Sequence, residues 1–128
     1  MNLQKYSYEH FPEISSTNQY SIDKIGELPN KHIVIADRQL AGRGRLDRTW
    51  VSDDAENLYM SIILKPDESI DFRSVLPNIT QYTSVVLSEI FNEYLGEVEL
   101  EAKIKWPNDV LVDGLKVAGI LAESVIQG

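Results

Sequence analysis

One long segment with helical spacing, from Phe72 or Pro77 to Leu95, constrains the fold of this 128-residue chain more than any other feature. Its side chains recur at steps of three and four residues and give one wide apolar face. They are Leu76, Ile79, Thr83, Val86, Leu87, Ile90, Phe91 and Tyr94. Gly96 is the expected end of the helix. We expect this face to pack in a core and to take no part in binding a cofactor.

Short segments before the helix predict strands. They are Tyr6–Phe11, which alternates like a half-buried strand, the β-branched run His32–Ala36, and Asn57–Leu64, which stops before Pro66. Between the first two, the residues Ser15, Ser16 and Thr17 can cap a short helix that runs through Ile25 and ends at Gly26.

Three further strands are expected after the helix, namely Ala102–Trp106, Val110–Val112 and Leu115–Glu123. The pair Asp113-Gly114 between the last two is a strong signal for a two-residue hairpin. Leu115–Ser124 has the character of a central strand. Because no further strand follows it in this sequence, we expect either that its edge is exposed or that the natural domain continues. The pattern predicts an α/β fold of the α+β type, with a mixed, largely antiparallel sheet and helices packed on one face.

The composition predicts one globular domain over residues 1–128. It has 43% hydrophobic residues, and 20 acidic against 12 basic residues give a net charge of −8, which disfavours nucleic acid as a partner. Without cysteine, the chain has no disulfide, thiolate nucleophile or cysteine metal site. There is no apolar run of membrane-spanning length, and the polar start Met1–Lys5 is unlike a signal peptide, so we expect a cytoplasmic protein.

Three arginines lie close together in a glycine-containing run that follows the predicted strand His32–Ala36. Between Gly42 and Trp50 lie Arg43, Arg45 and Arg48. Glycine lets the backbone approach a ligand closely, and guanidinium groups offer forked donors to carboxylates and phosphates. Two interpretations of this run alone stay open, a solvated arginine-rich loop and a clamp for a small anion.

A second segment, Lys105–Asp109 followed by Gly114–Leu121, favours the clamp. Taken alone, Pro107–Asp109 is best explained as a turn. Lys116 is explained either as an exposed strand residue or as a residue that binds a ligand. We expect Trp106 to be a core aromatic residue.

The two histidines, His10 and His32, have no neighbours at metal-ligand spacing. We expect structural or surface roles for them.

Five segments in this order resemble the catalytic domain of biotin protein ligases, the biotin–[acetyl-CoA-carboxylase] ligases. They are Ser16–Asn18, Gln39–Trp50, Asn57–Tyr59, Lys105–Asp109 and Lys116–Leu121. The two long motifs are specific individually, and the resemblance covers nearly the whole chain. It implies a fold like that of class II aminoacyl-tRNA synthetases and biotin synthetases.

The resemblance implies a reaction in two steps. The carboxylate of biotin attacks the α-phosphate of ATP to give biotinyl-5'-AMP and pyrophosphate, and a lysine of a biotin carboxyl carrier domain then attacks the mixed anhydride. ATP and Mg²⁺ are the implied cofactors, and biotin is the substrate. We expect no DNA or membrane partner, and a homodimer is one possible assembly. Such chemistry needs no protein nucleophile, because it depends on aligning two anions beside cations.

The same resemblance assigns residues to the two ligands. Around biotin it places Ser16, Thr17, Asn18, Gln39, Gly42, Arg43, Lys116 and Gly119. At ATP it places Arg45, Arg48, Trp50, Asn108 and Asp109, the last two near the nucleotide or its Mg²⁺, with no metal held by protein ligands alone. Arg43 is expected to hold the biotin carboxylate and later the acyl phosphate, and Lys116 to stabilise the reacting carboxylate and α-phosphate.

One position departs from the family pattern Gly-Arg-Gly-Arg-x-Gly-Arg-x-Trp, because Asp47 stands where the second-half glycine is expected. Aspartate tolerates a left-handed backbone better than most residues. Its carboxylate also competes with ATP for Arg45 and Arg48, so we expect weakened nucleotide binding.

The resemblance further implies that residues 1–128 form an incomplete catalytic domain. A winged-helix domain and a C-terminal β-barrel, both common in the family, are not part of this sequence, so repression of transcription is not expected. Alternatives to an active ligase are a remnant that binds biotin or a partner without catalysis, and acyl transfer of the lipoate ligase type. A nucleic-acid-binding module is the least favoured.

Overall fold

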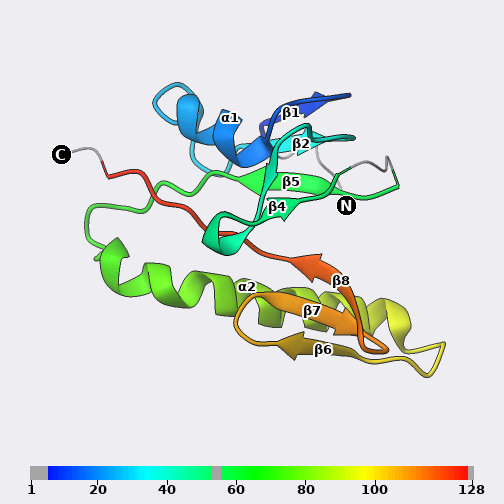
Figure 1. Ribbon diagram of the computed structural model, residues 1–128. Coiled ribbons are helices and arrows are strands. Elements are labelled where there is room, and N and C mark those ends of the chain that lie inside the picture. The colour runs from blue at the N-terminus through cyan, green and yellow to red at the C-terminus, as the bar shows by residue number, and fades with distance from the viewer. Residues whose placement is uncertain (1–5, 53–55, 127–128) are drawn as a thin grey trace. The chain divides into compact units, whose positions relative to one another are not determined.

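The computed structural model describes residues 6–52 and 56–126, so the polar start Met1–Lys5 lies outside the described residues. The chain divides into two compact units, one up to Asp67 and one from Glu68. The first holds β1 (Tyr8–Phe11), α1 (Thr17–Asp23), β2 (Ile33–Ala36), β3 (Gly42–Arg43), the 3-10 turn η2 (Arg45–Asp47), β4 (Thr49–Trp50) and β5 (Tyr59–Ile62). The second holds α2 (Phe72–Leu95), β6 (Ala102–Lys105), β7 (Asp109–Val112) and β8 (Leu115–Gly119) (Figure 1).

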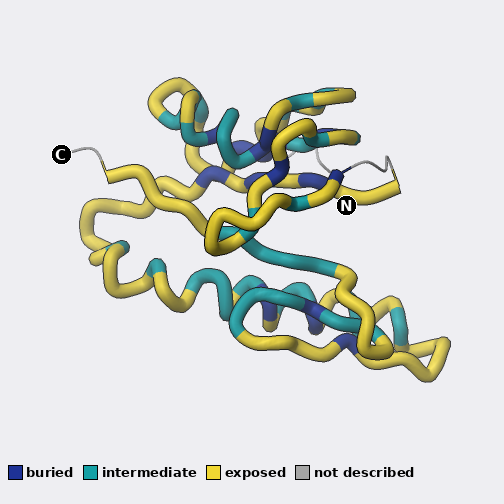
Figure 2. The backbone as a smooth tube through the Cα atoms, viewed as in Figure 1, coloured by how far each residue is buried: buried dark blue, intermediate teal, exposed yellow. Residues whose placement is uncertain are grey.

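The core of the first unit is built on β2, the middle strand of a sheet ordered β1–β2–β5. β1 runs parallel to β2, and β5 runs antiparallel to it. Val34 and Ala36 on β2 are 0% and 1% exposed, and Tyr59 and Ile63 are buried as well (Figure 2). The continuous apolar run of β2 is what a strand covered on both faces requires.

Helix α1 begins as predicted, because the hydroxyl of Ser16 accepts a hydrogen bond from the Gln19 N–H as an N-cap. The helix ends at Asp23, before the expected Ile25. Phe11 of β1 meets Tyr20 of α1 edge to face at 4.9 Å. Partial burial, followed by a hydrogen bond to Glu9, raises the pKa of the Tyr20 phenol.

Helix α2 has the predicted bounds and most of the predicted inward face, with two exceptions. Ile90 and Tyr94, both predicted to pack in the core, are 42% and 80% exposed, whereas Ser84 and Ser88 are buried. Each serine returns its hydroxyl to the helix backbone, Ser84 to the Thr80 carbonyl at 2.9 Å and Ser88 to the Val85 carbonyl at 2.8 Å. A serine satisfied in this way can be buried, and its small size lets the sheet approach.

The sheet of the second unit is antiparallel and ordered β6–β7–β8, with α2 packed against β6 and β7 (Figure 1). The central strand is β7, and Val110 on it is 0% exposed. The strand predicted from Leu115 is shorter than expected, since β8 ends at Gly119. Among the described strands, β8 pairs with β7.

Two further expectations in this unit have opposite outcomes. Trp106 is 73% exposed, so its predicted place in the core is wrong. It lies in the turn between β6 and β7, where its peptide bond to Pro107 is cis. The hairpin at Asp113-Gly114 is confirmed, with φ of 48° and 75° and with Val112 facing Leu115.

The histidines have the structural and surface surroundings that were expected. His32 is 4% exposed, and its Nδ1 lies 2.7 Å from the Ser7 hydroxyl while its Nε2 lies 3.3 Å from a Glu9 carboxylate oxygen. His10 is exposed and pairs with Asp37 at 2.7 Å.

The predicted fold class is confirmed as a mixed α/β arrangement with mostly antiparallel strands. Among the described strands, the pairing of β1 with β2 is parallel, and the pairings of β2 with β5, β3 with β4, β6 with β7 and β7 with β8 are antiparallel. In the described part of the chain, neither helix combines the length and the apolar character needed to cross a membrane.

Two glycines of the second unit provide a matched test of the turns. Gly114 has φ of +75°, whereas Gly96 at the end of α2 has the right-handed φ of −58°. We expect Gly114→Ala to lower the free energy of unfolding by about 1 kcal/mol because alanine is strained at positive φ. Gly96→Ala should leave it unchanged or raise it by about 0.4–1 kcal/mol. Urea denaturation followed by circular dichroism measures both, and equal losses would contradict the turn geometry.

Candidate functional site

The arginine run forms a short hairpin in the first unit. Gly42 and Arg43 of β3 pair with Trp50 and Thr49 of β4, and the Gly44 N–H donates to the Arg48 carbonyl at 2.7 Å. The three arginine side chains belong to exposed residues, while Trp50 is half-buried. The hairpin therefore brings Arg43, Arg45 and Arg48 together on one short loop, as the sequence predicted.

The tip of this hairpin carries an unusual backbone. Leu46 and Asp47 both have φ of 57°, in the left-handed region. Glycine adopts this conformation freely, and aspartate adopts it at a cost of roughly 1–2 kcal/mol. The expectation that Asp47 occupies a glycine-like position is thus confirmed in its backbone.

Gly42 has little room for a side chain. A Cβ at this position would lie 2.6 Å from the Trp50 carbonyl oxygen, 3.0 Å from the Ser52 hydroxyl and 3.1 Å from the Gln39 side-chain nitrogen. Glycine is needed here for space, since the φ angle at this position is not in the left-handed region.

A backbone pairing holds Gln39 beside the start of α1. Ile14 and Gln39 form a parallel bridge, and the Leu40 N–H donates to the Ile14 carbonyl at 2.9 Å. The Ala41 N–H donates to the Ser15 carbonyl at 2.8 Å. These bonds fix the chain just before β3 against the chain just before α1.

The side chain of Gln39 then joins both segments. Its Oε1 accepts from the Thr17 N–H at 2.8 Å and from the Thr17 hydroxyl at 3.2 Å. A backbone N–H can only donate, so this contact defines the oxygen end of the amide. The amide nitrogen donates to the Ser52 hydroxyl at 3.3 Å, and Ser52 donates to the Trp50 carbonyl at 3.4 Å.

The network continues to β5 through a residue that the sequence prediction missed. The Ser61 hydroxyl lies 2.8 Å from the Thr17 hydroxyl and is hydrogen-bonded to Asn18 Oδ1. The available signal was its position between Tyr59 and Ile63 on the inward side of an alternating strand, where a polar residue needs a partner. Ser52, 2% exposed, was missed for lack of any pattern around it.

In the second unit, the structure brings Asp109 and Lys116 together. The Lys116 ammonium lies 2.8 Å from Asp109 Oδ1, and this carboxylate is the more buried partner, with 19% of its side chain exposed against 42% for the lysine. The oxygen Oδ1 is fully buried and meets no hydrogen bond of good angle. We interpret the short distance as an ion pair, because a 2.8 Å approach between opposite charges is attractive whatever the angle.

A β-bulge explains how these two side chains meet. The register is Asp109 with Gly119 but Leu111 with Lys116, so one extra residue of β8 is accommodated between these pairs. Without it, Leu111 would face Val117, and Lys116 would point to the opposite side of the sheet. The bulge puts Lys116 on the same face as Asp109.

Asn108 holds the chain that follows β8. Its side-chain amide donates to the Ile120 carbonyl at 3.2 Å, and its own carbonyl accepts from the Ile120 N–H at 2.9 Å. Three of the predicted residues of the second unit, Asn108, Asp109 and Gly119, therefore lie where β7 begins and β8 ends. Lys116 lies near the start of β8 and reaches Asp109 through its side chain.

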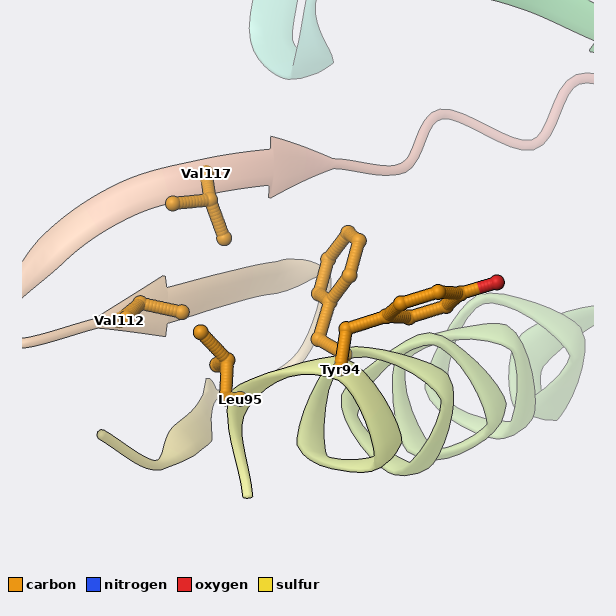
Figure 3. Close-up of a pocket in the computed structure, with 5 residues that line it drawn as sticks. Tyr94, Leu95, Val112 and Val117 are labelled. Atoms are coloured by element: carbon orange, nitrogen blue, oxygen red, sulfur yellow. The ribbon is translucent and has the colours of Figure 1, made fainter. Parts of the chain in front are cut away.

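An apolar cavity of about 430 Å³ lies elsewhere in the second unit, between the end of α2 and the strands β7 and β8. Figure 3 shows Val112 and Val117 on the strands and Leu95 and Tyr94 at the end of the helix, with Leu95 directed toward Val112. The predicted ligand-binding residues do not line it. Among residues 6–52 and 56–126, we find no cluster of three histidine, aspartate or glutamate side chains placed to hold a metal.

Comparisons with known proteins identify the same family by sequence and by structure. Residues 10–128 match the model of the biotin/lipoate A/B protein ligase family. The bifunctional ligase/repressor BirA of Bacillus subtilis is 39% identical over 115 residues, which are 88% of this chain and 34% of that protein, and BirA of Escherichia coli is 38% identical over 113 residues. The chain spans about a third of the length of these curated relatives.

Solved structures agree with this match. A biotin protein ligase from Aquifex aeolicus in complex with biotin and ATP has a TM-score of 0.70 and 32% identity, covering 92% of this chain and 47% of that one. A biotin protein ligase from Leishmania major has a TM-score of 0.77 at 24% identity, a likeness that supports the fold alone. The class II synthetase-like fold expected from the sequence is therefore confirmed.

The close approach at Gly42 can be tested against Gly44. We expect Gly42→Ala to lower the free energy of unfolding by about 1–3 kcal/mol, because the added methyl group must displace the Trp50 carbonyl or the Gln39 amide. Gly44→Ala should cost less, since its nearest neighbour would lie at 3.3 Å. Urea denaturation of both variants provides the comparison, and a larger loss for Gly44→Ala would contradict the packing described.

Proposed function

Since the chain belongs to the biotin/lipoate A/B protein ligase family, we propose that it activates biotin with ATP and transfers it to a lysine of a biotin carrier domain. The observation that carries this proposal is the hydrogen-bond network of the first unit. It links Thr17 and Asn18 to Gln39, and Gln39 through Ser52 to the arginine hairpin. Neutral donors and acceptors suit a ureido ring, and the adjoining guanidinium groups suit a carboxylate and phosphates.

In the first step, a carboxylate oxygen of biotin forms a bond to the α-phosphorus of ATP. The bond from that phosphorus to the β-phosphate oxygen breaks, and pyrophosphate leaves with the electron pair. We assign Arg43 to the carboxylate, and Arg45 and Arg48 to the phosphates. Cations at these places lower the repulsion between the two anions and stabilise the charge that develops in the transition state.

Lys116 is assigned to the reacting carboxylate and α-phosphate, and the Asp109 contact defines how it is held. The ion pair at 2.8 Å keeps the ammonium oriented before a ligand arrives. We propose that Asp109 acts on Lys116 rather than on a metal ion, because one carboxylate that already faces an ammonium is a poor magnesium site. Mg²⁺ would be bound by the phosphates of ATP and would neutralise part of their charge.

The other assigned residues have simpler roles. Trp50 offers an aromatic face for the adenine ring, and Asn108 lies beside Asp109 near the nucleotide. Ser16 and Gly42 are assigned to the biotin ring with Thr17, and Gly119 to a close approach of the ligand to β8. In the second step, the carrier lysine forms the amide bond to the biotin acyl carbon, and AMP leaves as the carbon–oxygen bond breaks.

A second candidate function, ligand binding without catalysis, is favoured by the carboxylate of Asp47 between Arg45 and Arg48. Incubation with biotin, ATP and Mg²⁺ distinguishes the two. Pyrophosphate release and biotinyl-5'-AMP support the ligase, and calorimetric biotin binding without product supports the binding protein. Pyrophosphate release with lipoate but not with biotin would assign the chain to the lipoate side of the family.

We expect Arg43→Ala and Lys116→Ala each to reduce the rate of adenylation by about 10²-fold or more, as loss of preorganised charge does. The measurement is pyrophosphate release under saturating ATP. Matched controls are Arg38→Ala and Lys103→Ala, whose side chains are exposed and pair with Glu13 and Glu101. A loss below tenfold for both test variants would show that the site is misplaced.

Replacing Asp47 tests whether its carboxylate competes with ATP. Asp47→Asn removes the charge but keeps a side chain that tolerates positive φ. Asp47→Gly removes both the charge and the backbone strain. We expect each variant to tighten ATP binding about two- to fivefold, the size of an exposed charge interaction, in calorimetry at fixed ionic strength. Unchanged affinity in both variants would contradict the competition.

A further inference from the structure

A serine, a histidine and a glutamate meet where β1 and β2 begin, at the opposite end of β2 from the arginine hairpin. Ser7 and Glu9 are two residues apart on an extended chain, so their side chains point to the same face of the sheet. Because Tyr8 pairs with Ile33 in the parallel register, the residues that precede them, Ser7 and His32, lie opposite each other. The Ile33 N–H donates to the Ser7 carbonyl at 3.0 Å and fixes this register.

The hydrogen bonds of His32 assign a role to each nitrogen of its ring. Nε2 lies 3.3 Å from a carboxylate oxygen of Glu9, and a carboxylate can only accept, so Nε2 carries the proton. A neutral imidazole has one N–H, which leaves the lone pair of Nδ1 facing the Ser7 hydroxyl at 2.7 Å. A hydroxyl, a base that accepts its proton and a third group that orients the base form the arrangement that activates a serine nucleophile.

Burial separates the base from the hydroxyl that it would activate. His32 is 4% exposed, whereas Ser7 is exposed. The backbone of His32 is held on both sides, because its carbonyl accepts from the Ile63 N–H at 2.9 Å and its N–H donates to the Pro29 carbonyl at 3.3 Å. The base is therefore fixed and shielded, and the hydroxyl can be reached by a reagent in solution.

Ser74 in the second unit shows what an exposed serine without a base looks like. It is also exposed, but its hydroxyl donates to the Asp71 backbone carbonyl at 2.7 Å. A peptide carbonyl accepts a hydrogen bond but does not take up the proton at neutral pH. If the bond to His32 only satisfied a buried ring, Ser7 would be no more reactive than Ser74.

We propose that Ser7 is a reactive nucleophile that takes an acyl group from an activated acyl donor, with His32 as its general base, in a reaction separate from the proposed ligase activity. The Ser7 oxygen forms a bond to the acyl carbon while its proton passes to Nδ1 of His32. The bond between the acyl carbon and the leaving oxygen breaks, and the leaving group departs with the electron pair. Glu9 stabilises the imidazolium, which then returns one proton to the leaving group or to water.

The test uses para-nitrophenyl acetate, an activated ester, and the full chain. Peptide mass spectrometry over a time course measures the rate of acetylation at each serine of the same molecule. We expect Ser7 to be acetylated about 10²-fold faster than Ser74, as assistance by a general base provides. In urea at a concentration that unfolds the chain, the two rates should become similar, because the imidazole no longer lies beside Ser7.

Two variants test the partners of Ser7. His32→Gln removes the base, and the rate at Ser7 should fall to that at Ser74. Glu9→Gln removes the charge that stabilises the imidazolium, and we expect it to slow acetylation of Ser7 about tenfold or more. Glu9 is a positioning residue at the rim of the sheet, so the melting temperature and the rate at Ser74 should not change in Glu9→Gln.

Acetylation of Ser7 no faster than that of Ser74 in the folded chain overturns the inference. An equal excess at Ser7 in urea overturns it as well, since the reactivity would then come from the neighbouring sequence. So does an unchanged rate at Ser7 in Glu9→Gln together with an unchanged rate in His32→Gln that circular dichroism shows to be folded.

Discussion

The hydrogen bond from the Thr17 N–H to the side chain of Gln39 is the contact on which the first unit's site depends. It satisfies a backbone donor in the first turn of α1 that has no partner within the helix. It also defines which end of the Gln39 amide is oxygen, and so directs the amide nitrogen to Ser52 and the hairpin. One side chain thereby joins three segments, the start of α1, the chain that follows β2 and the chain that follows β4. Close packing at Gly42 leaves this amide little room to move.

In the second unit, a shift in strand register positions the predicted site residues. A strict two-residue alternation would put Lys116 and Asp109 on opposite faces, and the bulge in β8 brings them within 2.8 Å. Bulges often redirect a side chain beside a functional site. The sheet thus supplies a lysine whose position is set by the backbone and whose charge is balanced by a partly buried carboxylate.

The sequence was sufficient for features that depend on local rules. The Ser16 cap, the Asp113-Gly114 hairpin and the long helix α2 were predicted because each follows from a few neighbouring residues. The buried serines of α2 were not predicted, because counting apolar residues overlooks a serine that satisfies its own hydroxyl. The resemblance identified the residues assigned to the ligands, but the bulge beside Lys116 depends on pairing that no local pattern records.

In the first unit the neutral polar groups are buried and the charged groups are exposed, and solvation explains this difference. The neutral groups of Thr17 and Ser61 are buried, at 4% and 8% exposure, because a hydroxyl with a partner can leave water at little cost. Burying a guanidinium group costs far more, and Arg43, Arg45 and Arg48 are exposed. Water screens their charge until a ligand covers them. An anion that displaces this water lowers the local screening and is therefore attracted more strongly to the guanidinium groups. When one ligand carries both a ring and a carboxylate, we expect binding of the ring at the neutral site and binding of the carboxylate at the charged hairpin to reinforce each other.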